Sequence, residues 1–213
     1  MTPIVVIDYG MGNLRSVAKA LEHVSERRPV LVSSDPAVIA DAGHVVFPGQ
    51  GAMGSCMQRL ADLELIDVLR SAAQSKPFLG ICLGLQALFG RSDEDNGCDG
   101  LGVLPGEVTR LSDSKDAAGR QLKIPHMGWN RARQCQSHPL WAGVPDNSWF
   151  YFVHSYRVVA EDSSDVAAIT EYGGQFASAA ARGTLFATQF HPEKSHHAGL
   201  QLLRNFVQWD GRS

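Results

Sequence analysis

Residues 77–89 have the sequence PFLGICLGLQALF. Its first part is short and apolar, as in a buried strand, and its second part continues as a helical pattern. Gly80 and Gly84 flank Cys82 and permit the strained backbone of a sharp strand-to-helix turn. Such a turn lifts the sulfur off the strand end toward the helix N-terminus, which favours a thiolate. The stretch predicts a nucleophile elbow, although a buried cysteine between glycines that pack helix on strand is equally compatible.

The chain before and around this stretch alternates between short apolar runs and helical patterns. Strands are expected at residues 4–7, 30–32, 45–47 and 77–81, and helices at residues 14–24, after 35, at 60–73 and through 85–89. Asp35-Pro36 has the residue types of an N-cap and a first-turn proline. This alternation is typical of a parallel sheet with helices on both faces.

The pattern changes after about residue 100. Strands are expected at residues 103–111, 131–134, 149–159, 166–169 and 184–190, a polar surface loop at 112–119, and a closing helix at 200–209. The turn at residues 172–175 (YGGQ) could join two antiparallel strands. No repeat or long linker divides the sequence. We therefore predict a single α/β domain over residues 1–213, with a mixed, mostly parallel sheet flanked by helices and antiparallel strands in the second half.

Composition narrows the class of protein. The chain has 213 residues, of which 44% are hydrophobic and 19% charged, as in a soluble globular domain. The net charge of -3 argues against broad nucleic-acid binding. The N-terminal run resembles a buried strand rather than a signal peptide, and no apolar run reaches membrane-spanning length. The four cysteines form no C-x-x-C pair, so a reducing, cytoplasmic location is expected.

A second motif, Phe190-His191-Pro192-Glu193, directly follows the last expected strand. A thiolate that attacks an amide needs a proton donor for the departing amine, and His191 is a candidate. Glu193 can turn back and accept a hydrogen bond from the ring, which fixes its orientation as the third member of a triad does. Because strand ends of one sheet edge gather the site in open α/β folds, His191 and Cys82 could meet.

The motif is compatible with other interpretations. His-Pro-Glu alone is also compatible with a loop that carries a solvated acid. A zinc deaminase shares H-x-E but needs a downstream P-C-x-x-C, and no cysteine follows Cys135. His196-His197 could suggest a metal, but beyond Glu193 no further ligand lies nearby at the right spacing, so no metal is expected.

Two glycine loops follow expected strands. In Pro48-Gly49-Gln50-Gly51, backbone N–H groups could face a developing oxyanion together with the N–H of Leu83. Losing one such donor typically costs about 3–4 kcal/mol of transition-state stabilisation. An ordinary turn is the alternative. Residues 10–15 (GMGNLR) suggest a dinucleotide loop only superficially, because Arg15 replaces the third glycine; a close-approach loop at the same sheet edge is preferred.

Taken together, Pro-Gly-x-Gly, Gly-x-Cys-x-Gly and His-Pro-Glu, in this order and spacing, resemble class I (triad) glutamine amidotransferases. The resemblance covers most of the chain and implies their flavodoxin-like fold. Four further stretches are similar to the glutaminase subunits of imidazole glycerol phosphate synthases, from histidine biosynthesis. They are residues 9–14 (YGMGNL), 125–130 (PHMGWN), 151–156 (YFVHSY) and 190–195 (FHPEKS).

The resemblance implies an activity and assigns residues to it. Cys82 would attack the glutamine carboxamide and release ammonia, and His191, oriented by Glu193, would activate the water that hydrolyses the thioester. No cofactor is implied. The remaining residues that it assigns to the oxyanion site and to substrate binding are Gly49, Gly51, Leu83, Gln86, His154, Ser155 and Tyr156.

The resemblance also implies a partner, a separate (β/α)₈ cyclase subunit that forms a heterodimer with this chain. The partner would use ammonia to make imidazole glycerol phosphate and AICAR, and ammonia must travel there neutral through a sheltered passage. Asn13, Trp129, Tyr151 and Lys194 would lie at that interface, with core packing as the alternative for Trp129 and Tyr151. Gln50 is bulkier than the valine typical of the family, which should alter tuning more than chemistry.

Three rival functions stay open on the sequence alone. An amidotransferase serving another synthase would share the triad, and residues 127–130 and 153–156 argue against it. An inactive binding module would have no need of all three triad residues. A free-standing cysteine hydrolase would turn over without a partner.

Overall fold

The structure, a computed structural model, describes residues 2–115 and 118–212. The strands are β1 (Ile4–Ile7), β2 (Val30–Ser33), β3 (His44–Gly49), β4 (Phe78–Cys82), β5 (Phe89–Ser92), β6 (Cys98–Asp99), β7 (Leu104–Arg110), β8 (His126–Gln134), β9 (Ser148–His154), β10 (Tyr156–Ala160), β11 (Val166–Glu171), β12 (Gln175–Arg182) and β13 (Leu185–Thr188). The helices are α1 (Leu14–Val24), α2 (Pro36–Ala40), α3 (Met53–Asp62), α4 (Ile66–Ser75), α5 (Leu83–Ala87) and α6 (His196–Gln208). Short 3₁₀ turns are η1 (Glu94–Asn96), η2 (Pro139–Trp141), η3 (Ser163–Asp165) and η4 (Pro192–Lys194).

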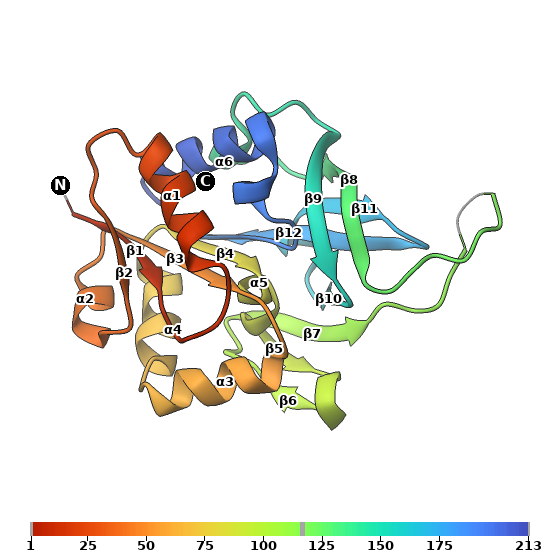
Figure 1. Cartoon of the computed structure of the whole chain (residues 1–213), viewed down its shortest axis with the longest axis horizontal. Coiled ribbons are helices and arrows are strands. Elements are labelled where there is room, and N and C mark those ends of the chain that lie inside the picture. Colours follow the sequence, from red (N-terminus) through yellow and green to blue (C-terminus); the bar gives the residue numbers. More distant parts are fainter. Residues whose placement is uncertain (1, 116–117, 213) are drawn as a thin grey trace.

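All of these strands join one mixed sheet (Figure 1). Its main path runs β2-β1-β3-β4-β13-β12-β10-β7-β5-β6, and β11, β8 and β9 branch from β12. The pairs from β2 to β13 are parallel, whereas β12 pairs antiparallel with β13, β10 and β11. The predicted fold class, a single α/β domain with a mixed sheet and antiparallel strands in the second half, is confirmed.

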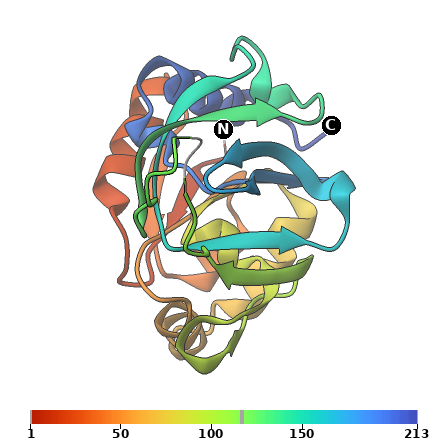
Figure 2. The same ribbon diagram turned by 90° about the vertical axis from the view of Figure 1, so that its right-hand side faces the viewer.

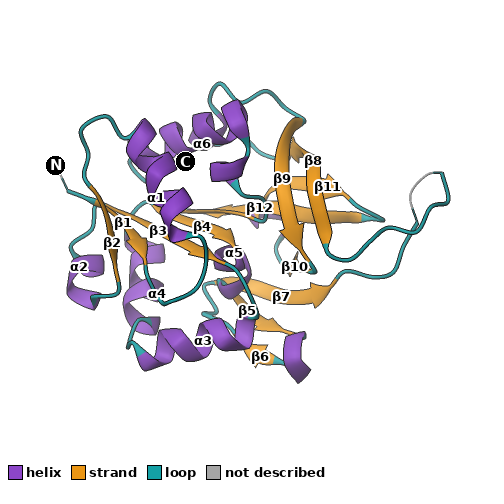
Figure 3. Ribbon diagram, in the orientation of Figure 1, coloured by secondary structure: helices purple, strands orange, loops and turns teal. Residues whose placement is uncertain are grey.

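Helices cover both faces of the parallel half because its strands are apolar on both sides. Along β1, Val5 and Ile7 enter the core that α3 and α4 cover, and Ile4 and Val6 enter the core beneath α1 and α6. Figure 3 shows these two helix layers on opposite sides of the sheet. The carboxyl ends of β3, β4 and β13 consequently point the same way, and the residues that follow them can share one edge.

The antiparallel half is shown from its own side in Figure 2. Strands β11 and β12 form a hairpin in which Glu171 pairs with Gln175, so the turn predicted at residues 172–175 is confirmed. Gly173 adopts φ 66° and Gly174 φ 133°, values that favour glycine. Strand β8 pairs with both β9 and β11, which brings its side chains over the end of the parallel half.

The single helix expected at residues 60–73 is wrong. Helix α3 ends at Asp62, and α4 begins at Ile66. Between them Glu64 has φ 57°, and the Leu65 amide donates to the Leu60 carbonyl at 2.8 Å, as in a Schellman-type helix end. Because Leu60 and Leu65 are both buried, the apolar pattern runs through the break and conceals it.

Other boundaries also differ from the prediction: β8 begins at His126 rather than residue 131, and α6 begins at His196 rather than residue 200. The helix after Cys82 ends at Ala87, and Phe89 already begins β5, so the expected helix through residue 89 is too long. The strand expected at residues 149–159 is two strands, β9 and β10, separated at Ser155. Of the loop expected at residues 112–119, positions 116 and 117 lie outside the described residues. No helix in the described part of the chain is long and apolar enough to cross a membrane.

Candidate active site

Cys82 ends β4 and stands at the N-cap position of α5, with φ 56° and ψ -106°. A non-glycine residue in the left-handed region stores strain, which is common at functional positions. A Cβ on Gly84 would collide with the Phe47 main-chain oxygen, so glycine is needed there to pack α5 on β3. The two interpretations of the glycines are therefore compatible: Gly84 packs the helix, and the turn presents Cys82.

His191 follows β13 and lies at the neighbouring strand end of the same sheet edge, because β13 pairs with β4. Its Nδ1 is 2.8 Å from Glu193 Oε1, and the exposed fractions of the two side chains are only 3% and 1%. A carboxylate only accepts, so Nδ1 carries the proton and donates to Glu193. The main chain of His191 is fixed by its amide donating to the Tyr151 carbonyl at 2.9 Å, and by Ser195 Oγ donating to its carbonyl at 2.6 Å.

Electrostatics couple His191 to the sulfur. Burial lowers the pKa of His191, but the Cys82 sulfur and the Glu193 carboxylate outweigh burial and raise this pKa to about 9. The Nε2 atom of His191 is buried and has no hydrogen-bond partner among the described residues. The imidazole therefore has one nitrogen held by the acid and the other available for proton transfer beside Cys82.

Val153 and Gln189 each place a polar atom near the Cys82 sulfur. The thiol lies 3.9 Å from the Val153 carbonyl oxygen, to which it can donate, and Gln189 Nε2 donates to the sulfur at 3.7 Å. Gln189 is fully buried just after β13. Sequence reasoning missed Gln189; its only signal was its place at a strand end, two residues before His191.

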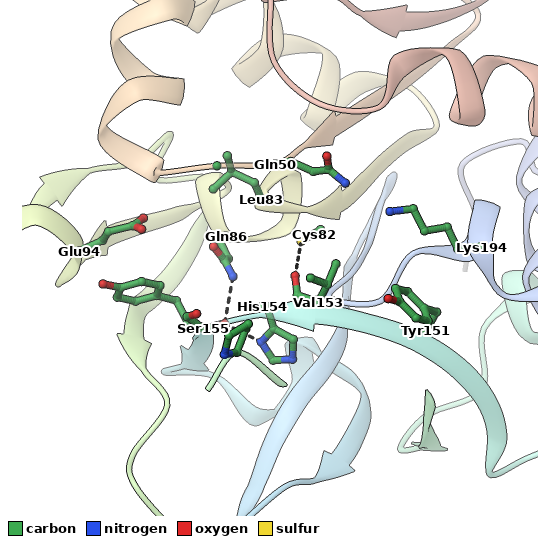
Figure 4. Close-up of a pocket in the computed structure, with 13 residues that line it drawn as sticks. Gln50, Cys82, Leu83, Gln86, Glu94, Tyr151, Val153, His154, Ser155 and Lys194 are labelled. Atoms are coloured by element: carbon green, nitrogen blue, oxygen red, sulfur yellow. Dashed lines mark hydrogen bonds between the residues drawn. The ribbon is translucent and has the colours of Figure 1, made fainter. Parts of the chain in front are cut away.

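A cavity of about 490 Å³ opens in front of Cys82. Figure 4 shows Cys82 between Gln50 and Val153, with Glu94 on one side and Lys194 and Tyr151 on the other. Glu94 was also missed by sequence reasoning, since it lies in η1, far from any motif. Burial raises the pKa of Glu94, although its Oε2 accepts from the Met53 amide at 2.7 Å. The cavity thus has an acidic side chain, Glu94, on one side of Cys82 and a basic side chain, Lys194, on the other.

The four residues expected to hold substrate all line this cavity: Gln86, His154, Ser155 and Tyr156. Gln86 Nε2 donates to the Tyr156 carbonyl at 3.0 Å and to Gln189 Oε1 at 3.1 Å. His154 Nδ1 is 2.8 Å from the same Tyr156 oxygen. The side chains of Gln86 and His154 are thus held through one main-chain carbonyl.

The three residues expected at the oxyanion site also lie beside Cys82. Gly49 pairs with Cys82 in the sheet, and Gly51 and Leu83 line the cavity. Gly51 adopts φ 98°, which favours glycine. A Cβ on Gly12 would lie 3.5 Å from the Gly49 Cα, so the loop at residues 10–12 packs against this turn.

Of the four residues expected at a partner interface, Asn13 and Trp129 are exposed, whereas Tyr151 and Lys194 are half-buried. Trp129 is 42% exposed, its ring is 6.0 Å from that of Tyr151, and Lys194 Nζ is 5.9 Å from the Tyr151 ring. Core packing is therefore excluded for Trp129. Asn13 is exposed and caps α1, its Oδ1 accepting from the Ser16 amide at 3.3 Å.

The structure gives no support for the metal site that His196-His197 could suggest. Within residues 2–115 and 118–212, no three His, Cys, Asp or Glu side chains gather as they would around a metal ion. His196 instead stacks on Trp129, with ring centroids 5.0 Å apart. Cys56 is buried, Cys98 half-buried and Cys135 exposed, and none of the three lines the cavity in front of Cys82.

Four comparisons with known proteins bear on this chain: one family model, two relatives and one solved structure. The family model for glutamine amidotransferase class-I matches residues 5–209. The chain is 57% identical to imidazole glycerol phosphate synthase subunit HisH of Aromatoleum aromaticum, covering 98% of this chain and 99% of that one. It is 56% identical to the subunit of the same name from Methylococcus capsulatus, covering 99% and 98%. A crystal structure of a glutamine amidotransferase superimposes with a TM-score of 0.70 at 18% identity, covering 96% and 97%, and supports the fold.

Proposed function

The chain belongs to the class-I glutamine amidotransferase family, and from that premise we propose that it is the glutaminase subunit of imidazole glycerol phosphate synthase. One observation carries the assignment of the reacting groups. His191 is bound by Glu193 at 2.8 Å, is coupled to the Cys82 sulfur, and the sulfur opens onto a cavity. A nucleophile, an acid–base group and its orienter therefore converge from two neighbouring strand ends.

In the first half of the reaction the Cys82 thiolate attacks the carboxamide carbon of glutamine and forms an S–C bond. The carbonyl oxygen takes up the negative charge, and the main-chain N–H groups of Gly51 and Leu83 are the proposed donors to it. As the C–N bond breaks, His191 gives its Nε2 proton to the departing nitrogen, which leaves as ammonia. With a pKa of about 9, His191 holds this proton at neutral pH.

In the second half a water molecule attacks the glutamyl thioester. His191, now neutral, takes the proton of the water through Nε2 while Glu193 stabilises the imidazolium that forms. The S–C bond breaks, and glutamate and the Cys82 thiolate are released with His191 reprotonated. The two halves use one histidine in opposite senses, so both depend on its Nδ1–H bond to Glu193.

The cavity has one charge suited to an amino acid. Glu94 offers a carboxylate complementary to the α-ammonium group of glutamine, and Lys194 lines the cavity on the opposite side of Cys82. Gln86 presents its carboxamide between them, with its nitrogen bound inward to Tyr156 and Gln189. We assign substrate orientation to these groups and to the main chain around His154, Ser155 and Tyr156.

The cyclase partner is proposed to dock on the outer face of β8 and β9. Side chains on β8 alternate, so that Met127 and Trp129 point outward while His126 is buried. Met127, Trp129 and the neighbouring Trp149 are 62%, 42% and 50% exposed, an apolar group rare on a monomer surface. Tyr151 and Lys194 join this face to the cavity, which gives ammonia a short way to a covering partner.

Reconstitution with the cyclase subunit tests this function. Glutaminase activity should be low in the isolated chain and should rise when the cyclase and its nucleotide ligand are added. Cys82→Ala should abolish glutamine-dependent synthesis by the complex, while added ammonium still supports it. Absence of glutamine hydrolysis in the complete complex would refute the proposal, and full turnover without the cyclase would favour a free-standing hydrolase instead.

A further inference from the structure

We propose that Gln189 positions the nucleophile: its side-chain N–H donates to the Cys82 sulfur, and Gln86, bound to a Tyr156 main-chain carbonyl that two buried histidines hold, fixes which end of that amide faces the sulfur. The proposal rests on the proposed function only in taking Cys82 as the nucleophile. Gln189 has an exposed fraction of 0%, and its Nε2 lies 3.7 Å from the sulfur.

An amide can face the sulfur with its nitrogen or with its oxygen, and the consequences are opposite. A nitrogen donates to a thiolate and stabilises it, whereas a carbonyl oxygen would repel it. The neighbouring groups decide between the two. Gln86 contacts the Tyr156 main-chain carbonyl at 3.0 Å, and a carbonyl only accepts, so this end of Gln86 must be Nε2. Gln86 Nε2 also faces Gln189 at 3.1 Å, so that end of Gln189 must be Oε1. The nitrogen of Gln189 is then left for the sulfur.

The Tyr156 carbonyl is held from the other side by two buried histidines. His154 Nδ1 lies 2.8 Å from this oxygen and must donate to it, so His154 Nε2 is the acceptor. His126 Nδ1 lies 2.9 Å from His154 Nε2 and supplies the proton. His126 Nε2 in turn faces Asn130 Nδ2 at 3.2 Å, an atom that only donates. Both rings therefore carry their proton on Nδ1 and are neutral.

The orientation of Asn130 is fixed as well, since its Oδ1 accepts from the Arg131 amide at 2.8 Å and its Nδ2 donates to the Glu171 carbonyl at 3.0 Å. The chain thus starts on β8, one residue from the exposed Trp129. It runs through the His126 and His154 rings and ends on the Tyr156 main-chain carbonyl. That carbonyl also accepts from Gln86 Nε2, and this bond orients Gln86 and, through it, Gln189.

The burial of His126 and His154 is consistent with this series of hydrogen bonds. Burial is the main cause that lowers the pKa of His126 to about 3 and that of His154 to about 4, with mutual repulsion adding to the effect for His126. Both rings stay neutral at the pH of ordinary metabolism, as the bonding pattern requires. The ring of His126 is also stacked on Tyr172 with centroids 3.9 Å apart, which restricts its rotation.

The test measures alkylation of Cys82 by iodoacetamide as a function of pH, followed by mass spectrometry of the Cys82 peptide. Gln189→Glu keeps the size and the acceptor for Gln86 but places a carboxylate oxygen at the sulfur. Gln189→Met removes the donor without adding charge. Both variants should raise the pH of half-maximal alkylation by about one unit, and should slow alkylation about tenfold at pH values below the midpoint of the unaltered chain.

Gln175→Glu is the matched control, because it makes the same change at an exposed position at the start of β12. An unshifted alkylation midpoint in the Gln189 variants, or an equal shift in the control, would overturn the proposal. Gln189→Met decides the matter if Gln189→Glu does not fold. In the unaltered chain, ¹⁵N NMR supplies a second readout: Nδ1–H tautomers on His126 and His154 support the arrangement around the Tyr156 carbonyl that holds Gln86, and an Nε2–H tautomer on His154 overturns it.

Alkylation needs neither glutamine nor a partner, so this test is separate from that of the proposed function. If the complex hydrolyses glutamine but the Gln189 variants show unshifted alkylation midpoints, only the role proposed for Gln189 is refuted. A complex that fails to hydrolyse glutamine refutes the proposed function, whatever the alkylation midpoints are.

Discussion

Replacing Glu193 with glutamine removes the carboxylate that faces His191 and leaves the side-chain volume nearly unchanged. Burial lowers the pKa of His191, and the sulfur and Glu193 raise it to about 9 from an ordinary value of 6.5. A hydrogen bond to a charged group contributes about 1.5–3 kcal/mol, and one pKa unit corresponds to about 1.4 kcal/mol. Glu193→Gln should therefore lower the pKa of His191 by about one to two units.

The same change alters stability in a pH-dependent way. Because the pKa of His191 is higher in the folded chain, the folded state binds this proton more tightly. Its contribution is present in full below pH 6.5, decreases as the pH rises toward 9, and is absent above that value. The shift from 6.5 to about 9 corresponds to about 3 kcal/mol, of which the variant should lose a part. The free energies of unfolding of the two proteins should converge at high pH.

An NMR titration of ¹⁵N-labelled histidine measures the pKa directly, and urea unfolding at several pH values measures the stability. Glutaminase activity of the complex should fall on the order of 10⁴-fold, since a glutamine N–H facing Nδ1 favours the wrong tautomer. Glu161→Gln, at an exposed position, is the control. The reasoning fails if His191 of the unaltered chain titrates near 6.5, or if Glu193→Gln leaves its pKa unchanged.

Three further predictions follow from packing, charge and surface. Gly84→Ala should destabilise the chain by about 1–3 kcal/mol or more in urea unfolding, because its Cβ meets a main-chain oxygen of β3. Gly54→Ala is the contrast: its Cβ has open space around it, so it should stabilise α3 by about 0.8–1 kcal/mol. Between pH 6.5 and about pH 4, the free energy of unfolding should fall as the pH falls, because His126 and His154 are neutral in the folded chain and have low pKa values there. Each such ring should contribute about 1.4 kcal/mol per pH unit. A free energy of unfolding by urea that is constant over this range would contradict these low pKa values. Trp129→Ala should leave the melting temperature of the isolated chain nearly unchanged but weaken cyclase binding by about 2 kcal/mol in calorimetry, and unchanged affinity would exclude Trp129 from the interface.

The sequence predicted the candidate site best where its residues lie at the ends of strands. Cys82 and His191 each follow an apolar run, and parallel strands bring such residues to one sheet edge. The fold class was predictable from the alternation of strand and helix patterns, and the family from the order and spacing of three short motifs. The catalytic roles of Cys82 and His191 are proposed from their geometry.

The sequence was least informative where tertiary contacts decide. The break at Glu64 was missed because buried leucines continue the apolar pattern across it. The separation of β9 and β10 at Ser155 was missed because aromatic and β-branched residues typical of strands continue on both sides of it. Gln189 shows its importance only through contacts with Gln86 and Cys82, over a hundred residues away in the chain, which no local pattern encodes.

The central claim is that Cys82 becomes covalently attached to the glutamyl group of the substrate. The complex with the cyclase should be mixed with isotope-labelled glutamine, quenched in acid during turnover, and digested for mass spectrometry. We expect a labelled glutamyl thioester on the Cys82 peptide, and none in Cys82→Ala. Label on another cysteine, or rapid glutamine hydrolysis by the Cys82→Ala complex, would contradict the account.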